Sequence, residues 1–245
     1  MRPPTTDPPQ AHPPSGTITV SRVDWNTPVD IYCERLTAGP WSEPLNAISN
    51  LSFFAAAVFA WLLIRHRQAP ASIKWVIILL ALVGVGSSAF HIYAEVWGSA
   101  LDTGFIALWV LWYTCVYARF FWRLSWRFAW LGAPAIIVFA VLVQFTLTPI
   151  LPEGVRLYAA PALALLGITV ALSARDELSR YIPGFATATA LFWLSLTFRS
   201  IDGPACHSVP IGTHFLWHIL NGIVLYLLTR TLITRWRDCA ESFTS

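Results

Sequence analysis

Two histidines, His214 and His218, are the residues whose type and spacing most directly suggest chemistry. They lie four residues apart in the apolar run 211–229, which has roughly the 20 residues that a helix needs to cross a bilayer. Imidazoles at this spacing share one face of a helix and can hold one metal ion. Each could instead pack in the interior with a satisfied hydrogen bond. Because ionisable side chains inside a membrane usually mark a site, we favour metal binding.

A third imidazole, His91, is predicted at the same membrane depth, near the outer end of segment 75–95. Ser87 precedes it by four residues and therefore shares its helical face. Three histidines leave the fourth tetrahedral position of a zinc ion to water, as in catalytic zinc sites. Asp102 opens the next apolar segment at this depth. It could be only a helix cap or dipole partner. Beside three histidines, we interpret it as a proton carrier or as a carboxylate that orients a metal ligand.

Three acidic residues, Asp30, Glu34 and Glu43, cluster just before the first apolar segment. Carboxylate and carbonyl oxygens are the ligands that calcium prefers, so this irregular stretch could bind a calcium ion. The same residues could equally form a solvated segment beside the membrane. The sequence leaves both interpretations open.

The elements that must position these residues belong to an all-α integral membrane protein. Of the 245 residues, 56% are hydrophobic and 12% are charged, which excludes a soluble domain. With a net charge of +3 the chain has no basic patch that would suggest a nucleic-acid partner. We predict a seven-transmembrane helix bundle. The predicted spans are residues 46–64, 75–95, 100–118, 129–149, 157–173, 183–199 and 211–229.

The basic residues predict the orientation of this bundle, because Lys and Arg concentrate in cytoplasmic loops. Eleven of the sixteen Lys and Arg residues fall on one side of the predicted spans. These are Arg65, Arg67, Lys74, Arg119, Arg123, Arg127, Arg175, Arg180, Arg230, Arg235 and Arg237. The N-terminus is therefore predicted outside and the C-terminus in the cytoplasm.

This topology divides the chain into four predicted parts. Residues 1–20, rich in Pro and Thr, form a disordered tail with no cleavable signal. Residues 21–45 form an extracytoplasmic N-terminal segment. Residues 46–230 form the seven-helix domain, and residues 231–245 form a cytoplasmic tail.

The loop between the sixth and seventh predicted spans lies on the outer side. Arg199 and Asp202 are three residues apart before it and could form an ion pair. Cys33 and Cys206 are the two cysteines predicted outside, since Cys115 falls within a span and Cys239 in the cytoplasmic tail. Two thiols on an oxidising face suggest a disulfide between the N-terminal segment and this loop.

The motifs Gly86-Ser87-x-x-x-His91, Asp102 and His214-x-x-x-His218 together resemble the alkaline ceramidase family. That family belongs to a seven-span superfamily of hydrolase-like proteins that also contains the adiponectin-type receptors. The resemblance extends from Asp30 to about Arg230. It implies that the three histidines bind zinc and that Ser87 and Asp102 line the reacting centre.

The N-terminal segment carries a second part of the resemblance. The stretches Tyr32-Cys33-Glu34-Arg35 and Trp41-x-Glu43-Pro44-x-Asn46-x-x-Ser49-Asn50 are similar to the family's calcium-binding segment. Cys33 and Cys206 match the family's disulfide. The acids are spaced differently from those of the eukaryotic enzymes, and the short chain is more similar to bacterial members. A bacterial inner membrane, with the site facing the extracytoplasmic side, is the localisation that this implies.

The function implied is zinc-dependent hydrolysis of the amide bond of a ceramide-like membrane lipid. Asp102 would carry a proton from water to the leaving amine, and Ser87 would donate a hydrogen bond to the developing oxyanion. The products would be a long-chain base and a fatty acid. The alternatives are hydrolysis of another lipid amide or ester, and a receptor-like protein in which zinc is structural.

Overall fold

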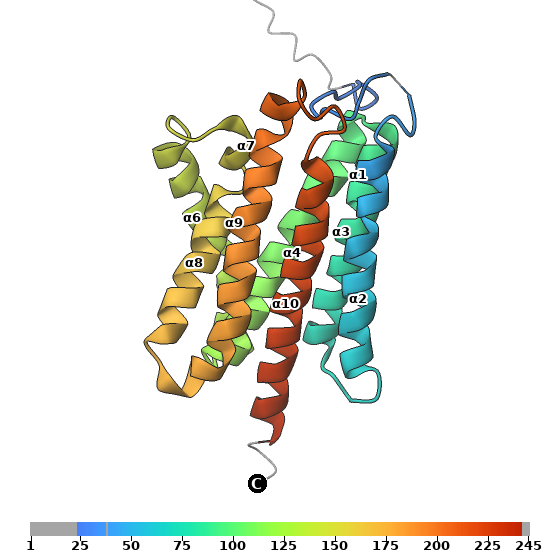
Figure 1. Cartoon of the computed structure of the whole chain (residues 1–245). Helices are drawn as coiled ribbons and strands as arrows, with labels where there is room; N and C mark the ends of the chain where they lie inside the picture. Colours follow the sequence, from blue (N-terminus) through green and yellow to red (C-terminus); the bar gives the residue numbers. More distant parts are fainter. Residues whose placement is uncertain (1–23, 38, 242–245) are drawn as a thin grey trace, which may run out of the picture.

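The computed structural model describes residues 24–37 and 39–241, which form a bundle of long helices (Figure 1). Besides helices and turns, the described residues contain one isolated β-bridge, between Pro28 and Glu95. The helices are α1 (Pro44–Ser49), α2 (Leu51–Ile64), α3 (Ala71–Tyr93), α4 (Val96–Phe121), α5 (Trp126–Ala129), α6 (Gly132–Leu147), α7 (Glu153–Arg156), α8 (Ala159–Ser173), α9 (Ile182–Ala205) and α10 (His214–Glu241), with a 3-10 helix η1 (Asp176–Tyr181) before α9. The predicted tail 1–20 lies outside the described residues.

Within the described residues, six helical stretches are long and apolar enough to cross a membrane, so the chain is a multi-pass membrane protein. They correspond to six of the seven predicted spans. The seventh prediction, 157–173, forms α8, which has only 15 residues and is reported as a shorter apolar helix. At 1.5 Å per residue α8 is about 22 Å long, less than the hydrocarbon core of a typical bilayer.

Several boundaries differ from the predicted ones. The helix that carries Asp102 begins at Val96, so Asp102 lies in its second turn and does not cap it. The last helix continues to Glu241, so that most of the predicted cytoplasmic tail extends α10. Apolar composition marks where a helix lies in the bilayer, but a helix continues for as long as its backbone hydrogen bonds can be made.

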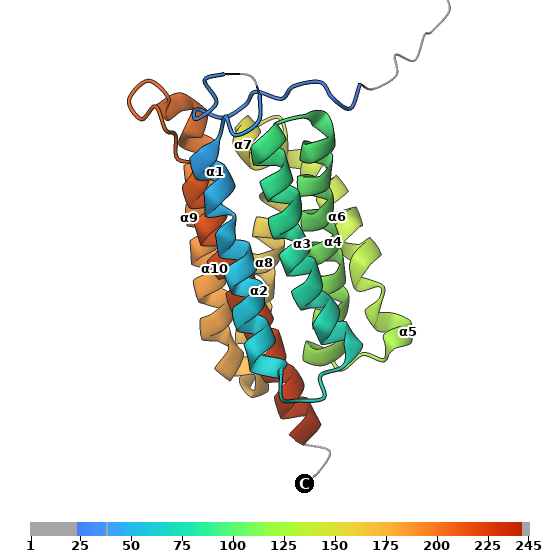
Figure 2. The same cartoon turned by 90° about the vertical axis from the view of Figure 1, so that its right-hand side faces the viewer.

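The bundle places α10 between α9 and α2, while α3 packs along α4 (Figures 1 and 2). Gly86 of α3 allows a close approach to α4. A Cβ there would lie 2.8 Å from the backbone oxygen of Leu101 on α4. This contact brings Ser87 on α3 and Asp102 on α4 to the same level of the bundle.

The N-terminal segment, residues 24–37 and 39–43, crosses the end of the bundle where α3 gives way to α4 (Figure 2). Val29 donates its N–H to the carbonyl of Ala94 at 2.7 Å, and Trp41 donates to Ile92 at 2.8 Å. Ala94 ends α3 in a left-handed conformation, with φ of 49°. The segment is therefore a fixed cover over the end of the helices. We call this end of the bundle the outer end and the opposite one the inner end.

Cys33 and Cys206 form a disulfide, as the sequence predicted, and it joins this cover to the end of α9. Asp202 reinforces the connection, because its carboxylate accepts hydrogen bonds from the backbone N–H groups of Cys33, Thr213 and His214 at 2.6–3.0 Å. The predicted ion pair of Asp202 with Arg199 is wrong: backbone donors occupy this carboxylate. Gly212, with φ of 68°, permits the approach, since a Cβ there would lie 2.3 Å from an Asp202 oxygen.

Candidate metal centre

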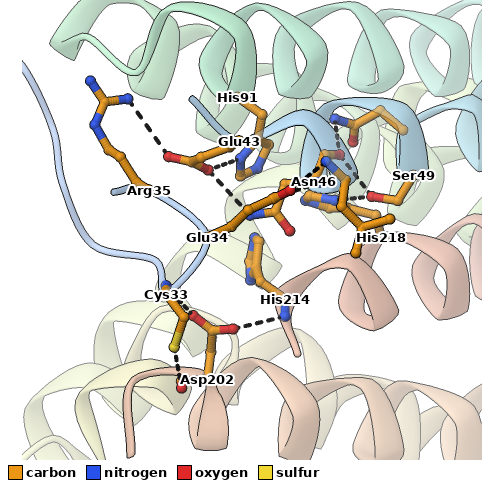
Figure 3. A network of polar contacts seen from close by, with 12 residues as sticks. Cys33, Glu34, Arg35, Glu43, Asn46, Ser49, His91, Asp202, His214 and His218 are labelled. Carbon is orange, nitrogen blue, oxygen red and sulfur yellow. Dashed lines mark hydrogen bonds and ion pairs between the residues drawn. The ribbon is translucent and has the colours of Figure 1, made fainter. Parts of the chain in front are cut away.

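The structure brings His91 of α3 together with His214 and His218 of α10 at the outer end of the bundle (Figure 3). All three are buried, with at most 2% of their surface exposed. One candidate ligand atom from each lies within 4.8 Å of those of the other two. This spacing is short enough for a single ion to contact all three.

Glu43 orients His91. Its Oε2 lies 2.6 Å from His91 Nδ1, and a carboxylate at that position accepts the Nδ1 proton. The other ring nitrogen, Nε2, is buried and has no protein partner among the described residues. Burial raises the pKa of the Glu43 carboxyl to about 7, while the Asn46 amide and the nearby Arg35 guanidinium act in the opposite direction. The hydrogen bond leaves the Nε2 lone pair of His91 available to a metal.

Ser49 fixes the protonation pattern of His218 in a similar way. Its hydroxyl donates to the Asn46 carbonyl at 2.7 Å, and the same oxygen lies 2.7 Å from His218 Nδ1. Because the single hydroxyl proton is already used, Ser49 accepts the proton on Nδ1. His218 therefore presents the Nε2 lone pair.

His214 is held by the N-terminal segment and by Asp202. The Tyr32 ring stacks on its imidazole, with centroids 3.7 Å apart and planes 21° apart. Its backbone N–H donates to Asp202 at 2.9 Å, which anchors the first residue of α10. Its Nδ1 is buried without a partner among the described residues. Burial raises the pKa of Tyr32, so the phenol stays protonated.

Ser87 and Asp102, the predicted catalytic residues, are neighbours on α3 and α4. The Ser87 side chain interacts with the Asp102 carboxylate. One oxygen of that carboxylate, Oδ1, is buried and accepts no hydrogen bond from the described residues. An unpaired buried carboxylate oxygen is unfavourable unless something else binds there. The pair therefore presents both a hydroxyl and a carboxylate oxygen inside the outer end of the bundle.

The calcium interpretation of the acidic residues is not supported. Asp30 is exposed, whereas Glu34 accepts hydrogen bonds from the N–H groups of Leu45 and Asn46 at 2.5 and 2.8 Å. Glu43 faces the buried Arg35 guanidinium at 3.8 Å as well as His91. Among the described residues these three acids do not form a group that could hold a metal ion. The positive charge beside Glu43 is supplied by Arg35, directly after Glu34 in the chain.

Sequence reasoning missed three functions around the histidines. It assigned Glu43 to calcium, and it named Tyr32 and Ser49 only as members of the stretches that are similar to the family's calcium-binding segment. The spacing Glu43-x-x-Asn46-x-x-Ser49 was the available signal, because residues three apart share one helical face. Nothing local in the sequence indicates that Tyr32 stacks on a histidine of the last helix.

The helical bundle and its buried histidines define a multi-pass membrane protein with a candidate three-histidine metal centre. The sequence profile of the ceramidase family, described as "Ceramidase", matches residues 32–242, and the chain belongs to this family. Family membership supports a hydrolase that acts on lipid amides. A search of the curated proteins found no match to this chain.

Proposed function

We propose that this protein is a zinc-dependent amidohydrolase that cleaves ceramide-like membrane lipids to a long-chain base and a fatty acid. The observation that carries the proposal is the convergence of His91, His214 and His218 in a chain of the ceramidase family. Neutral imidazoles in a buried site are suitable ligands for Zn²⁺.

The residues around the histidines fit this metal. Glu43 and Ser49 accept the Nδ1 protons of His91 and His218, which is how partners of zinc-bound histidines normally orient the ring. Bound there, zinc would act as a Lewis acid and lower the pKa of a water molecule, as hydrolysis requires.

Two residues of the chain would handle protons and charge in the reaction. The free Oδ1 of Asp102 is suited to accept a proton from water and to return it to the leaving amine. Ser87 would donate a hydrogen bond to the oxygen of the amide carbonyl as negative charge develops on it. Ser87 precedes His91 by one helical turn on α3, which would bring this pair of residues near a substrate amide bound at the histidines.

A catalytic role is favoured over a structural one by the number of protein ligands. Within the described part of the chain, no fourth His, Cys, Asp or Glu joins the three-histidine group. Structural zinc sites are normally closed by four protein ligands, whereas catalytic sites keep one position for water. The receptor-like alternative therefore has less support than the enzyme.

For the membrane topology, we propose seven spans with α8 as the shortest. The proposal is supported by the N-terminal segment and the end of α10, which lie at opposite ends of the bundle (Figure 1), as expected for an odd number of passes. The basic loops would face the cytoplasm and the metal centre the outside. Residues 21–45 would then be extracytoplasmic and 46–230 would form the hydrolase domain, in a bacterial inner membrane.

The decisive experiment combines metal analysis with turnover of a ceramide panel by the purified protein. We expect about one zinc per chain and release of fatty acid, with both lost in His218→Ala. His207→Ala is the matched control, because this exposed histidine lies outside the three-histidine group. Full zinc retention in His218→Ala would refute the ligand assignment. Zinc binding without hydrolysis of any ceramide would favour the receptor-like alternative.

A further inference from the structure

Arg199, near the outer end of α9, is an arginine inside a membrane helix that has no carboxylate in ion-pair contact among the described residues. None of the ion pairs among the described residues includes it. Its Nε is buried and has no hydrogen-bond partner there either. A cation inside a membrane protein is expensive and normally pairs or marks a binding site. Arg199 therefore requires an explanation that the reaction described above does not provide.

The protein fixes this guanidinium without neutralising it. One terminal nitrogen donates to the carbonyl of Gly154 on α7 at 2.8 Å. The guanidinium carbon lies 4.9 Å from the centroid of the Tyr158 ring and 5.6 Å from that of Trp217. Aromatic faces and a carbonyl attract a cation but carry no net charge. No carboxylate of the described residues lies within ion-pair distance of the guanidinium, so an anion that reaches it can form that contact.

This charge lies next to the metal centre. Trp217 precedes His218 in the chain, and its ring lies 6.5 Å from that of His214, nearly parallel to it. Tyr32, which stacks on His214, also interacts with the Arg199 guanidinium. Asp102 interacts with the guanidinium electrostatically. A ligand bound at the histidines would therefore come under the influence of Arg199.

The same two rings border an apolar cavity. Tyr158 and Trp217 line it together with Val83, Trp109, Phe192 and Leu228. Trp217 and Leu228 are eleven residues apart on α10, so the cavity extends for about 16 Å along this helix. A fixed cation at one end and an apolar channel below it complement a molecule with an anionic head and a long alkyl tail.

We propose that Arg199 binds the carboxylate of a long-chain fatty acid whose tail occupies this cavity. The inference rests on the proposed function, because this acid is the acyl half that ceramide hydrolysis releases. Hydrolysis breaks the C–N bond of the amide and forms a C–O bond to the oxygen of water; the amine takes up a proton and the carboxylic acid loses one. The amide is neutral and the product is an anion, so an unpaired cation favours the product over the substrate.

The test measures binding and needs no turnover. Purified protein is titrated with palmitate and with palmityl alcohol, which has the same chain and no charge, and tryptophan fluorescence reports binding. We expect Arg199→Gln to weaken palmitate binding by ~10-fold or more, as for the loss of a hydrogen-bonded charge. Affinity for the alcohol should not change. Arg199→Lys should bind palmitate with intermediate affinity, because it keeps the charge and loses the planar fork.

Arg156→Gln is the matched control, since Arg156 lies at the same end of the bundle and is half-buried with an exposed partner, Glu153. Its palmitate affinity should equal that of the wild type. If Arg199→Gln does not fold, wild-type protein is labelled with palmitate that carries a photoreactive group beside its carboxylate. The label should then attach near Arg199 and Trp217.

The outcomes separate this inference from the proposed function. Equal palmitate affinity in wild type and Arg199→Gln, or labelling only away from Arg199, overturns the inference even if ceramide is hydrolysed. Arg199-dependent palmitate binding in a protein that hydrolyses no ceramide supports the inference and removes the proposed reaction.

Discussion

The outer and inner ends of the bundle are both buried, but they are built from different groups. At the inner end, the rings of Phe121, Tyr181 and Phe185 pack edge to face, with centroids 5.3–5.4 Å apart. At the outer end, buried imidazoles, carboxylates and a guanidinium replace them, and His91 Nε2 and Asp102 Oδ1 have no protein partner within the described chain. The inner end also holds a buried guanidinium, that of Arg235, over the rings of Phe121 and Tyr181. What distinguishes the outer end is therefore its group of three imidazoles.

The two ends therefore contribute differently to the free energy of folding and to ligand binding. Ring packing stabilises the bundle without selecting a ligand. Polar groups left unpaired in a buried place destabilise it unless a ligand satisfies them. We therefore expect substitutions in the ring cluster of the inner end to change stability alone. Substitutions at the outer end should change metal binding or turnover, except where they cut the connections of the N-terminal cover.

The largest effect is expected for Asp102→Asn. The change keeps the shape of the side chain but removes the basic oxygen, so ceramide turnover should fall by ~10²–10⁴-fold. Zinc content should stay at the wild-type level, because Asp102 is not one of the three ligands. Turnover is measured on purified protein with matched zinc content. Wild-type turnover by Asp102→Asn would remove this carboxylate from the mechanism.

Phe185→Ala tests whether the ring cluster at the inner end affects stability and leaves metal binding unchanged. Phe185 is 0% exposed, and its removal leaves a cavity in the ring cluster. We expect a loss on the order of 3–5 kcal/mol in unfolding free energy, with zinc affinity of the folded protein unchanged. Phe145→Ala is the control, because this residue of α6 is 81% exposed and should be nearly neutral. Reduced zinc affinity in folded Phe185→Ala would contradict the separation of the two ends.

Cys33→Ala should lower the unfolding free energy by ~2–4 kcal/mol, because the disulfide no longer restricts the unfolded chain. The double variant Cys33→Ala, Cys206→Ala should have the same unfolding free energy as Cys33→Ala, since neither variant can form the disulfide. Chemical denaturation measures the loss, and intact mass after alkylation counts the thiols. Two alkylated thiols at these positions in the wild type would show that the bridge does not form.

The smallest effect is expected for Glu43→Gln. The amide can still contact His91 but no longer attracts the proton on Nδ1 as strongly, so zinc affinity should fall by ~10–100-fold. Competition with a chelator of known affinity measures it. Glu34→Gln is the control, because Glu34 binds the backbone of α1 and contacts no histidine. Equal zinc affinity in both variants would mean that Glu43 does not support the metal centre.

The sequence predicted the all-helical fold, the disulfide and the meeting of the three histidines, because each depends on a strong signal. Apolar runs, cysteines on one face and imidazoles at one depth can all be identified without knowing how helices pack. The supporting contacts could not be predicted. Asp202 accepts from His214 instead of pairing with Arg199, and Glu43 serves His91 instead of calcium, because both choices depend on which backbone and which cation lie nearest in space.

The distance along the chain between partners at the outer end has a consequence for how the protein is made. Ser49 and His218 are 169 residues apart, and Cys33 and Cys206 are 173 apart. Contacts between such distant parts of a chain form late in folding. The three-histidine group and the residues that support it join α1 and α3 to α10, the last of the described helices. We expect newly made chains to acquire zinc only after α10 has entered the membrane, which pulse labelling followed by metal-dependent protease protection would detect.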